Sequence, residues 1–356
     1  MYTSAITSLE GRLERLERPP VITITTDFGQ YDGYVGTMKG VIYTLLPDAV
    51  VVDISHEVRP QQIHEGAFIL YRAYRYFPAS AIHVAVVDPG VGSARRSIAL
   101  VTRHGTFVGP DNGIFTYVLR AEQVPMQHPD LSRRPPWAGG MWGVAPNWAG
   151  EESHNGYKDP VESIGMDDEE NRAESERDPG NEEDAEINHT PRAYLLSNPD
   201  FWLGGVSRTF HGRDIFAPVA AHLASGAQPD RMGEPVDIDS LVMLPLGAPR
   251  VSGQGRGTTV TGQVVHVDHF GNIITNLTDR LLAPLLDDAT SAPVVEIGGH
   301  HIFGLAGSYS DVREGQPVAL VGSEGLLEVS IRNANASHRM KIRIGDPVRL
   351  IVNRPD

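Results

Sequence analysis

The 356-residue sequence contains no cysteine, and this absence excludes several chemistries at once. Disulfide bonds, thiolate nucleophiles, iron–sulfur clusters and cysteine-ligated zinc all require a thiol. Positive charge is also scarce, with 30 Lys and Arg against 45 Asp and Glu and a formal net charge of −15. Because binding a phosphate backbone takes clustered Lys and Arg, we expect no nucleic-acid partner.

Long apolar runs are missing as well. No stretch approaches the roughly 18 consecutive apolar residues of a membrane span, and the first 20 residues lack the apolar core of a signal peptide. We therefore expect a cytoplasmic protein with no membrane partner. Leu9, Leu13 and Leu16 have helical spacing, so the leader over 1–20 is interpreted as a short amphipathic helix, with a frayed tail as the alternative.

Most of the negative charge lies in one segment. Residues 151–187 include 15 acidic residues, three basic residues and almost no clustered apolar side chains. Such a segment cannot bury enough apolar surface to offset the entropy lost on ordering. We therefore predict a disordered acidic insertion over 132–190. The alternative is an acidic docking segment, whose partner the sequence does not name.

The length predicts two domains, and the first half of the sequence alternates between two kinds of pattern. Short apolar runs typical of buried strands alternate with stretches of helical spacing. The order is strand 21–26, helix 34–46, strand 49–55, helix 63–77 and strand 81–88. This order is typical of a parallel sheet with right-handed crossovers, so we predict an N-terminal α/β domain with a mostly parallel sheet over 21–250.

The pattern changes after Val251. Six short β-rich runs follow, and they are separated by Gly, Asn and Asp. Such spacing is typical of an antiparallel barrel or sandwich. We predict a C-terminal antiparallel β-barrel domain over 251–356.

An acidic residue ends or directly follows each of the three N-terminal strands: Asp27, Asp53 and Asp88. Ligands of open α/β sheets bind outside the carboxyl ends of the strands. Asp27 and Asp88 are therefore candidate site residues. The alternative is that each Asp only caps the turn or helix that follows.

Two polar segments strengthen this candidate site. In DPGVGSARR, residues 88–96, the glycines allow backbone to approach a ligand closely, Asp88 supplies a base or acceptor, and Arg95 supplies a fixed positive fork. His211 lies on the loop before a predicted helix over 215–226 and is free to face a cleft. The adjacent Arg213 and Asp214 are interpreted as a structural pair or a helix cap.

Several standard catalytic motifs are missing from the sequence. It has no GxxxxGK[ST] phosphate loop, no HExxH and no GxSxG, and it shows no carboxylate and imidazole set at metal-ligand spacing. We expect no metal site and no cofactor. The residues alone support a small-molecule enzyme site made of Asp, Arg and His.

Six segments together resemble the S-adenosyl-L-methionine hydroxide adenosyltransferases, also called S-adenosylmethionine hydrolases, whose relatives are the adenosyl-halide synthases. They are TTDFGQYDGYVGTMKG (25–40), VVDISHEVRPQQIHEGAF (51–68), HVAVVDPGVGSARR (83–96), FVGPDNGIF (107–115), FHGRDIFAPVAAHLA (210–224) and VDHFGNIITN (267–276). The resemblance implies an N-terminal α/β domain, a C-terminal β-barrel and a homotrimer with sites between subunits. It also implies that water or hydroxide attacks C5′ of the ribose and releases adenosine and L-methionine.

The resemblance also assigns roles to residues. Asp88, Arg95 and His211 match the family's catalytic set, and Asp27 matches the carboxylate that binds both ribose hydroxyls. Phe270 and Asn272 match an adenine-binding segment, for which a plain hairpin turn is the alternative. The other matched residues form the methionine and adenine pockets: Asp268 and Ser323 for the methionine amine and carboxylate, Arg332, Asn333 and Ala334 for adenine, and Gln61 and Tyr309 as further binding residues.

Two rival functions stay open. An adenosyl-halide synthase is disfavoured because a carboxylate at Asp88 would repel a halide ion, and because Gly212 stands where the fluorinase has its halide-binding serine. A non-catalytic sensor of S-adenosylmethionine or adenosine would gain nothing from Asp88, Arg95 and His211. Glu324 departs from the halide synthases, which have Arg there, so recognition of the methionine carboxylate can differ.

Overall fold

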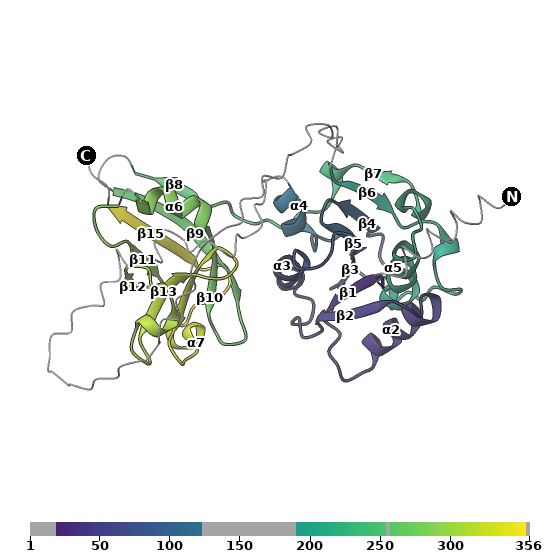
Figure 1. The fold of residues 1–356 in the computed structure, drawn as a ribbon, viewed down its shortest axis with the longest axis horizontal. Coiled ribbons are helices and arrows are strands. Elements are labelled where there is room, and N and C mark those ends of the chain that lie inside the picture. The colour runs from purple at the N-terminus through teal and green to yellow at the C-terminus, as the bar shows by residue number, and fades with distance from the viewer. Residues whose placement is uncertain (1–18, 123–189, 254–256, 288, 354–356) are drawn as a thin grey trace, which may run out of the picture.

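The computed structural model describes residues 19–122, 190–253, 257–287 and 289–353. Residues 1–18 of the predicted leader and residues 132–189 of the predicted insertion lie outside this part of the chain. The described residues form two lobes that lie side by side, each built around its own sheet (Figure 1). Within them, no helix is long and apolar enough to cross a membrane.

The N-terminal lobe contains a seven-stranded sheet in the order β2-β1-β3-β5-β4-β6-β7. Strands β2, β1, β3 and β5 pair in parallel, and β4, β6 and β7 continue the sheet in antiparallel pairing. The predicted α/β class is confirmed. The strands are β1 (Val21–Thr26), β2 (Val50–Ser55), β3 (Ile82–Val86), β4 (Ser97–Thr102), β5 (Gly105–Pro110), β6 (Arg192–Leu195) and β7 (Pro235–Val236).

Helices cover both faces of this sheet (Figure 1). Helices α2 and α5 pack together over a core that includes Ile22, Ile24 and Met38. On the other side, α3 and α4 enclose a second core that includes Leu70, Phe107 and Val118. The helices are α2 (Tyr34–Leu45), α3 (Ile63–Tyr74), α4 (Thr116–Glu122) and α5 (Ala217–Ala224), with 3-10 turns η3 (Pro199–Phe201), η5 (Pro229–Met232) and η6 (Ile238–Ser240).

Helix α3 and strand β3 end earlier than predicted, at Tyr74 and Val86, and two further differences bear on the site. A π-helical turn, η4 (Gly212–Phe216), precedes α5, so the helix predicted to begin at 215 starts just after His211. Pro218 has no N–H to donate, and the Ala217 N–H bonds the Gly212 carbonyl five residues back. Strand β2 runs to Ser55, which places Asp53 inside the strand rather than at its end.

The C-terminal lobe contains an antiparallel sheet in the order β12-β11-β15-β9-β10-β14-β13, with β8 beside β9. A bridge between Ala306 and Leu320 brings the two ends together, so the sheet forms a nearly closed barrel around an apolar core, as predicted. The strands are β8 (Arg250–Ser252), β9 (Gly257–Val267), β10 (Ile273–Thr278), β11 (Val294–Ile297), β12 (His300–Phe303), β13 (Pro317–Val321), β14 (Leu326–Ile331) and β15 (Pro347–Asn353).

Three short helical elements of this lobe were not expected from the sequence: α6 (Asp279–Asp287), η7 (Tyr309–Asp311) and α7 (Ala336–Met340). In α6, Leu282 and Leu286 are buried on one face, four residues apart. The five-residue α7 is too short to show a helical period.

Helix α3 joins the two lobes. Phe68 packs with Val265, Ile274 and Leu326 of the barrel, which are all buried. Beside them, Glu324 lies 3.2 Å from Nη2 of Arg72 and 3.6 Å from Nη2 of Arg75. This contact fixes where the barrel presents its loops relative to the N-terminal sheet.

Candidate active site

Two of the predicted acidic residues lie at one edge of the N-terminal sheet. Asp27 directly follows β1, and Asp88 comes two residues after β3. Because β1 and β3 are adjacent and parallel, their carboxyl ends meet at that edge. Oδ2 of Asp27 accepts a hydrogen bond of 2.7 Å from the N–H of Gln61, whose φ of 67° is in the left-handed region.

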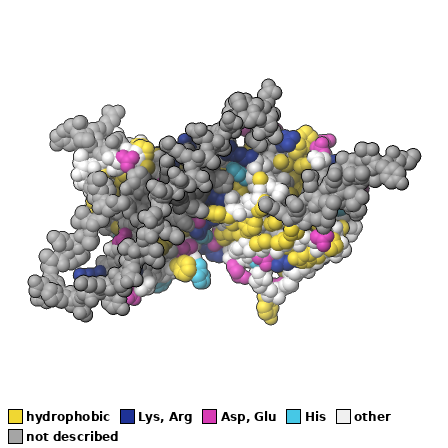
Figure 2. All heavy atoms as spheres, viewed as in Figure 1, with side chains coloured by type: hydrophobic (Ala, Val, Ile, Leu, Met, Phe, Trp, Pro, Cys, Tyr) yellow, Lys and Arg dark blue, Asp and Glu magenta, His cyan; other side chains and the backbone are white. Residues whose placement is uncertain are grey.

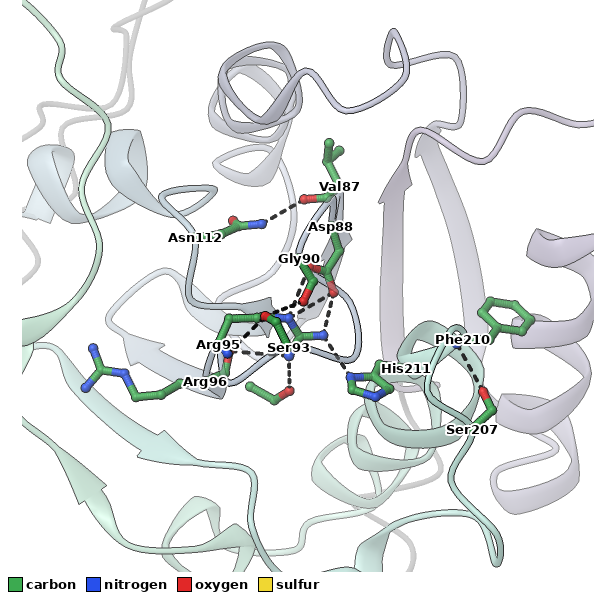
Figure 3. Close-up of polar contacts among 11 residues, drawn as sticks. Val87, Asp88, Gly90, Ser93, Arg95, Arg96, Asn112, Ser207, Phe210 and His211 are labelled. Atoms are coloured by element: carbon green, nitrogen blue, oxygen red, sulfur yellow. Dashed lines mark hydrogen bonds and ion pairs between the residues drawn. The ribbon is translucent and has the colours of Figure 1, made fainter.

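The guanidinium of Arg95 lies between Asp88 and His211 (Figure 3). Its Nε is 3.0 Å from each carboxylate oxygen of Asp88, and its Nη2 also contacts Oδ2. Nη2 lies 2.9 Å from Nδ1 of His211, and Nη1 donates to Oγ of Ser97 at 2.5 Å. The side chains of Asp88 and Arg95 are only 4% and 11% exposed, so little bulk water screens this pair.

The contact with Arg95 determines the protonation of His211. A guanidinium can only donate, so Nδ1 is the acceptor and the proton of the neutral ring is on Nε2. Burial and the positive charge of Arg95 hold the pKa of His211 below its ordinary value, against the opposing charges of Asp88 and Asp214. At neutral pH the site therefore combines a carboxylate, a guanidinium and a neutral imidazole.

Loop contacts hold these three side chains in place. At Gly92, φ is 75° and an added Cβ would lie 2.3 Å from the carbonyl oxygen of Arg208, so glycine is needed here for a close approach to the Arg208 backbone. On the other side of the loop, Nδ2 of Asn112 donates to the Val87 carbonyl at 2.8 Å (Figure 3).

The expected structural pair of Arg213 and Asp214 is confirmed. Nε of Arg213 donates to Oδ1 of Asp214 at 2.5 Å, while Oδ2 accepts from the N–H of Ser207 at 2.8 Å. The pair therefore fixes the loop that leads to His211.

In the barrel, Asp268, Phe270 and Asn272 belong to one tight turn between β9 and β10. Oδ1 of Asp268 accepts from the N–H groups of Phe270 and Asn272 at 2.9 and 2.8 Å, and Oδ2 accepts from Nδ2 of Asn272 at 2.9 Å. Phe270 and Asn272 thus do lie in a hairpin turn, which was the alternative to the adenine-binding segment. It is compatible with binding, because the Phe270 side chain is 73% exposed.

The other barrel candidates lie on neighbouring segments. The N–H of Ser337 donates to the Gly271 carbonyl at 3.0 Å, which ties the turn to the segment after Arg332. Nη1 of Arg332 donates to the carbonyls of Val312 and Ser310 at 2.7 and 3.3 Å, next to Tyr309. Asn333 is exposed with a φ of 57°, and the N–H of Ala334 bonds the Ile331 carbonyl at 3.0 Å.

The role of Glu324 is clear from its contacts. Oγ of Ser323 donates to its Oε1 at 3.2 Å, and the same oxygen accepts from Nε and Nη2 of Arg72 at 3.2 Å. Glu324 therefore belongs to the contact between the lobes, while Ser323 is exposed beside it.

The structure thus assembles two separate groups of candidate residues. Asp27, Gln61, Asp88, Arg95 and His211 lie in the N-terminal lobe, and the remaining candidates lie in the barrel. Among the described residues, no hydrogen bond or ion pair joins one group to the other, and no cluster of three His, Asp or Glu could hold a metal ion.

Sequence reasoning missed Glu328, which lies beside Tyr309. Its Oε1 accepts from the Tyr309 hydroxyl at 2.7 Å and from Oγ of Ser330 at 2.8 Å. The sequence offered one signal for Glu328, a charged residue within the apolar strand LLEVSI. A buried Glu almost always has a partner, so such a position indicates a specific interaction.

Comparisons with known proteins match both lobes of the chain. The model of the SAM hydroxide adenosyltransferase N-terminal domain matches residues 22–136 and 182–233, and that of the C-terminal domain matches 262–349. An (R)-S-adenosyl-L-methionine hydrolase from Thermus thermophilus is 33% identical over 92% of this chain and 97% of its own. A fluorinase from Actinopolyspora mzabensis is 25% identical over 93% of this chain and 97% of its own.

A solved structure has a similar fold over nearly its whole length. The crystal structure of an uncharacterized conserved protein from Thermotoga maritima aligns with a TM-score of 0.67 and 28% identity, covering 93% of this chain and 99% of that one. Both lobes and both groups of site residues therefore fall within the matched regions, and the chain belongs to the SAM hydroxide adenosyltransferase family.

Proposed function

We propose that this protein hydrolyses S-adenosyl-L-methionine to adenosine and L-methionine, without a cofactor. The observation that carries the proposal is the buried contact of Arg95 with both Asp88 and His211 at the carboxyl edge of the sheet. A C5′–O bond forms as the C5′–S bond breaks, and the electron pair stays on sulfur. The leaving group is a neutral thioether, so the departing sulfur needs no general acid.

Each residue of the proposed catalytic set has a distinct role. Asp88 orients the attacking water and accepts its proton, directly or through a relay. Arg95 stabilises the developing hydroxide, and neutral His211 holds the guanidinium through Nδ1. Asp27 binds the ribose hydroxyls, which fixes C5′ in line with the water.

The two separate groups of residues support a site shared between subunits. We propose a homotrimer in which the N-terminal lobe of one subunit meets the barrel of its neighbour, whose adenine-binding residues include Phe270 and Asn272. Tyr31 and Tyr34 of the N-terminal lobe are 98% and 47% exposed, and Figure 2 shows hydrophobic side chains over much of the visible face of that lobe. Exposed apolar surface of this kind is typical of an interaction site.

The proposal is tested by following the oxygen atom. Each sulfonium epimer of the substrate is incubated with the protein in ¹⁸O-labelled water, and the products are analysed by mass spectrometry. Label in the 5′-hydroxyl of adenosine, with none in methionine, is the expected result. Adenosine without label, or no product from either epimer, would contradict the proposal.

A further inference from the structure

A second polar network lies beside the proposed active site, between the ends of β1 and β2. His56 directly follows β2 and is 2% exposed. Its Nδ1 is 2.8 Å from Oγ1 of Thr26, the last residue of β1, and its Nε2 is 2.9 Å from Oδ1 of Asp53. Nζ of Lys39 contacts the other oxygen of Asp53 at 2.6 Å. A hydroxyl, an imidazole, a carboxylate and an ammonium group therefore form one chain of contacts.

The order of hydroxyl, imidazole and carboxylate is also that of an activated nucleophile, but this network cannot act as one. Thr26 is fully buried, so no substrate reaches its hydroxyl. Its Oγ1 also accepts a hydrogen bond of 3.3 Å from the N–H of Phe28, so the hydroxyl holds the turn that follows β1. The network therefore positions the backbone and takes no part in bond making.

His56 holds the turn that carries Asp27 at two points. Its side chain contacts Thr26, directly before Asp27. Its carbonyl accepts a hydrogen bond of 2.8 Å from the N–H of Gly29, two residues after Asp27. The loop after β2 also supplies the N–H of Gln61, which donates to Oδ2 of Asp27. Asp27 is therefore flanked by two contacts to the same residue.

The outer end of the network fixes the ring of His56. Burial raises the pKa of Asp53, but the contacts with His56 and Lys39 outweigh this effect and hold that pKa below its ordinary value. The carboxylate is therefore ionised at neutral pH and lies against Nε2 of the ring. This contact gives a role to Asp53, which lies inside β2 rather than at its end.

We propose that His56 is a positioning residue that orients Asp27 toward the ribose of the substrate. The inference rests on the proposed function, in which Asp27 binds both ribose hydroxyls. Two adjacent hydroxyls can bond one carboxylate only if its oxygens face them, so a small rotation of the turn removes one of the bonds. His56 prevents that rotation by holding the residues on both sides of Asp27.

The test measures recognition of the ribose hydroxyls by calorimetry, without turnover. Adenosine is compared with 2′,3′-dideoxyadenosine, which lacks both hydroxyls. The ratio of the two affinities depends on the placement of Asp27, whereas a general loss of stability weakens both ligands together. Wild type is expected to prefer adenosine by roughly tenfold or more, the effect of hydrogen bonds to a charged group, and Asp27→Ala is expected to lose that preference.

His56→Ala is expected to lose most of the preference as well, although Asp27 is intact. His56→Asn places an amide near the position of Nδ1 and should restore part of it. The matched control is His83→Ala, which removes a similar buried contact of 2.8 Å, between Nδ1 of His83 and Oγ1 of Thr23, from an earlier position on β1. This control should keep the wild-type preference. Asp53→Asn, at a carboxylate that is 34% exposed, should lose part of it and is the second variant if His56→Ala does not fold.

A wild-type preference in His56→Ala, or in Asp53→Asn where only that variant folds, would overturn the inference. An equal loss in His83→Ala would also overturn it, because the effect would then belong to any buried histidine of the sheet. A wild type that does not prefer adenosine would remove the role of Asp27 and the inference with it. Failure of the proposed hydrolysis is distinct, because wild type would then show the preference but release no adenosine from S-adenosyl-L-methionine.

Discussion

At the scale of single residues, the proposed chemistry depends on Arg95, because its guanidinium contacts the other two members of the set. It binds both carboxylate oxygens of Asp88 and Nδ1 of His211. Asp88 is therefore held in one orientation at the edge of the sheet. The same contacts would therefore orient a water molecule bound to Asp88.

Replacing Asp88 by Asn tests the role of this carboxylate. An amide keeps the size of the side chain but cannot take the proton of water, so turnover should fall by about 10²- to 10⁴-fold while substrate binding stays measurable. Single-turnover kinetics and calorimetry separate the two quantities. Asp200→Asn, at an exposed position in η3, is the control and should match wild type. Turnover of Asp88→Asn near the wild-type rate would contradict the mechanism.

The pH dependence of activity tests the role of His211. Its pKa lies below the ordinary 6.5 because of burial and Arg95. The ring is thus neutral above that pKa, and protonation at lower pH removes the acceptor that Nδ1 offers to Arg95. We expect kcat/KM to be level near neutral pH and to fall with a midpoint below 6.5.

The variant His222→Asn is the control, because His222 packs on Phe201 away from Arg95 and should keep this acidic limb. His211→Asn should lack the limb and turn over more slowly. A midpoint above 6.5, or the same limb in His211→Asn, would show that another group controls the profile.

At the scale of elements, the loop after β3 contacts the loop before η4. Gly92 allows the contact with the Arg208 backbone, which sets the distance between Arg95 and His211. Adding a single methyl group at Gly92 therefore tests whether the contact between the loops sets this distance.

The substitution Gly92→Ala should destabilise the fold by roughly 1–3 kcal/mol, because φ is unfavourable and the Cβ would overlap the Arg208 carbonyl. Activity should fall further than stability alone explains, since His211 moves with the loop. Gly226→Ala is the matched control, because φ there is 99° but an added Cβ meets nothing within 4 Å. Unfolding in urea and kcat are the measurements, and equal behaviour of the two variants would refute the account of this loop.

The elements also show how far sequence reasoning reaches. The first three strands of the N-terminal lobe and the helices α2 and α3 were predicted because apolar runs of β-branched residues alternate with helical spacing, as in VITITT and the segment of α3. Strands β4 to β7 and helix α4 were not predicted individually. The π-turn η4 was not predicted, because its form depends on Pro218 and on packing rather than on periodicity. Glu328 was missed because one charge in an apolar strand does not change the strand pattern.

Sequence reasoning about the site was strongest for residue type and weakest for position. Asp88, Arg95 and His211 were chosen from their motifs, and the structure brings them into contact although His211 is 116 residues from Arg95. The separation of the barrel residues from this set follows from the packing of α3 against the barrel, which no local pattern encodes.

At the scale of the whole molecule, the distribution of site residues over two lobes leads to a test of the proposed trimer. Asp88→Asn disables the N-terminal half of the site, and Asp268→Asn disables the barrel half. If sites are shared between subunits, co-refolding the two inactive variants should restore about one quarter of the wild-type sites. Activity and light-scattering mass are measured on the same sample.

The control mixes Asp88→Asn with His211→Asn, two changes in the same half, and should restore no activity. A monomer mass, or no recovery in the first mixture, would contradict shared sites while leaving the hydrolysis itself open to test.

The central claim is tested most directly by chromatography of the products formed from S-adenosyl-L-methionine, with and without chloride. We expect equal amounts of adenosine and methionine, unaffected by chloride and greatly reduced in Asp88→Asn. A chlorinated adenosine that forms only with chloride, or tight binding of the substrate with no product, would contradict the assignment as a hydrolase.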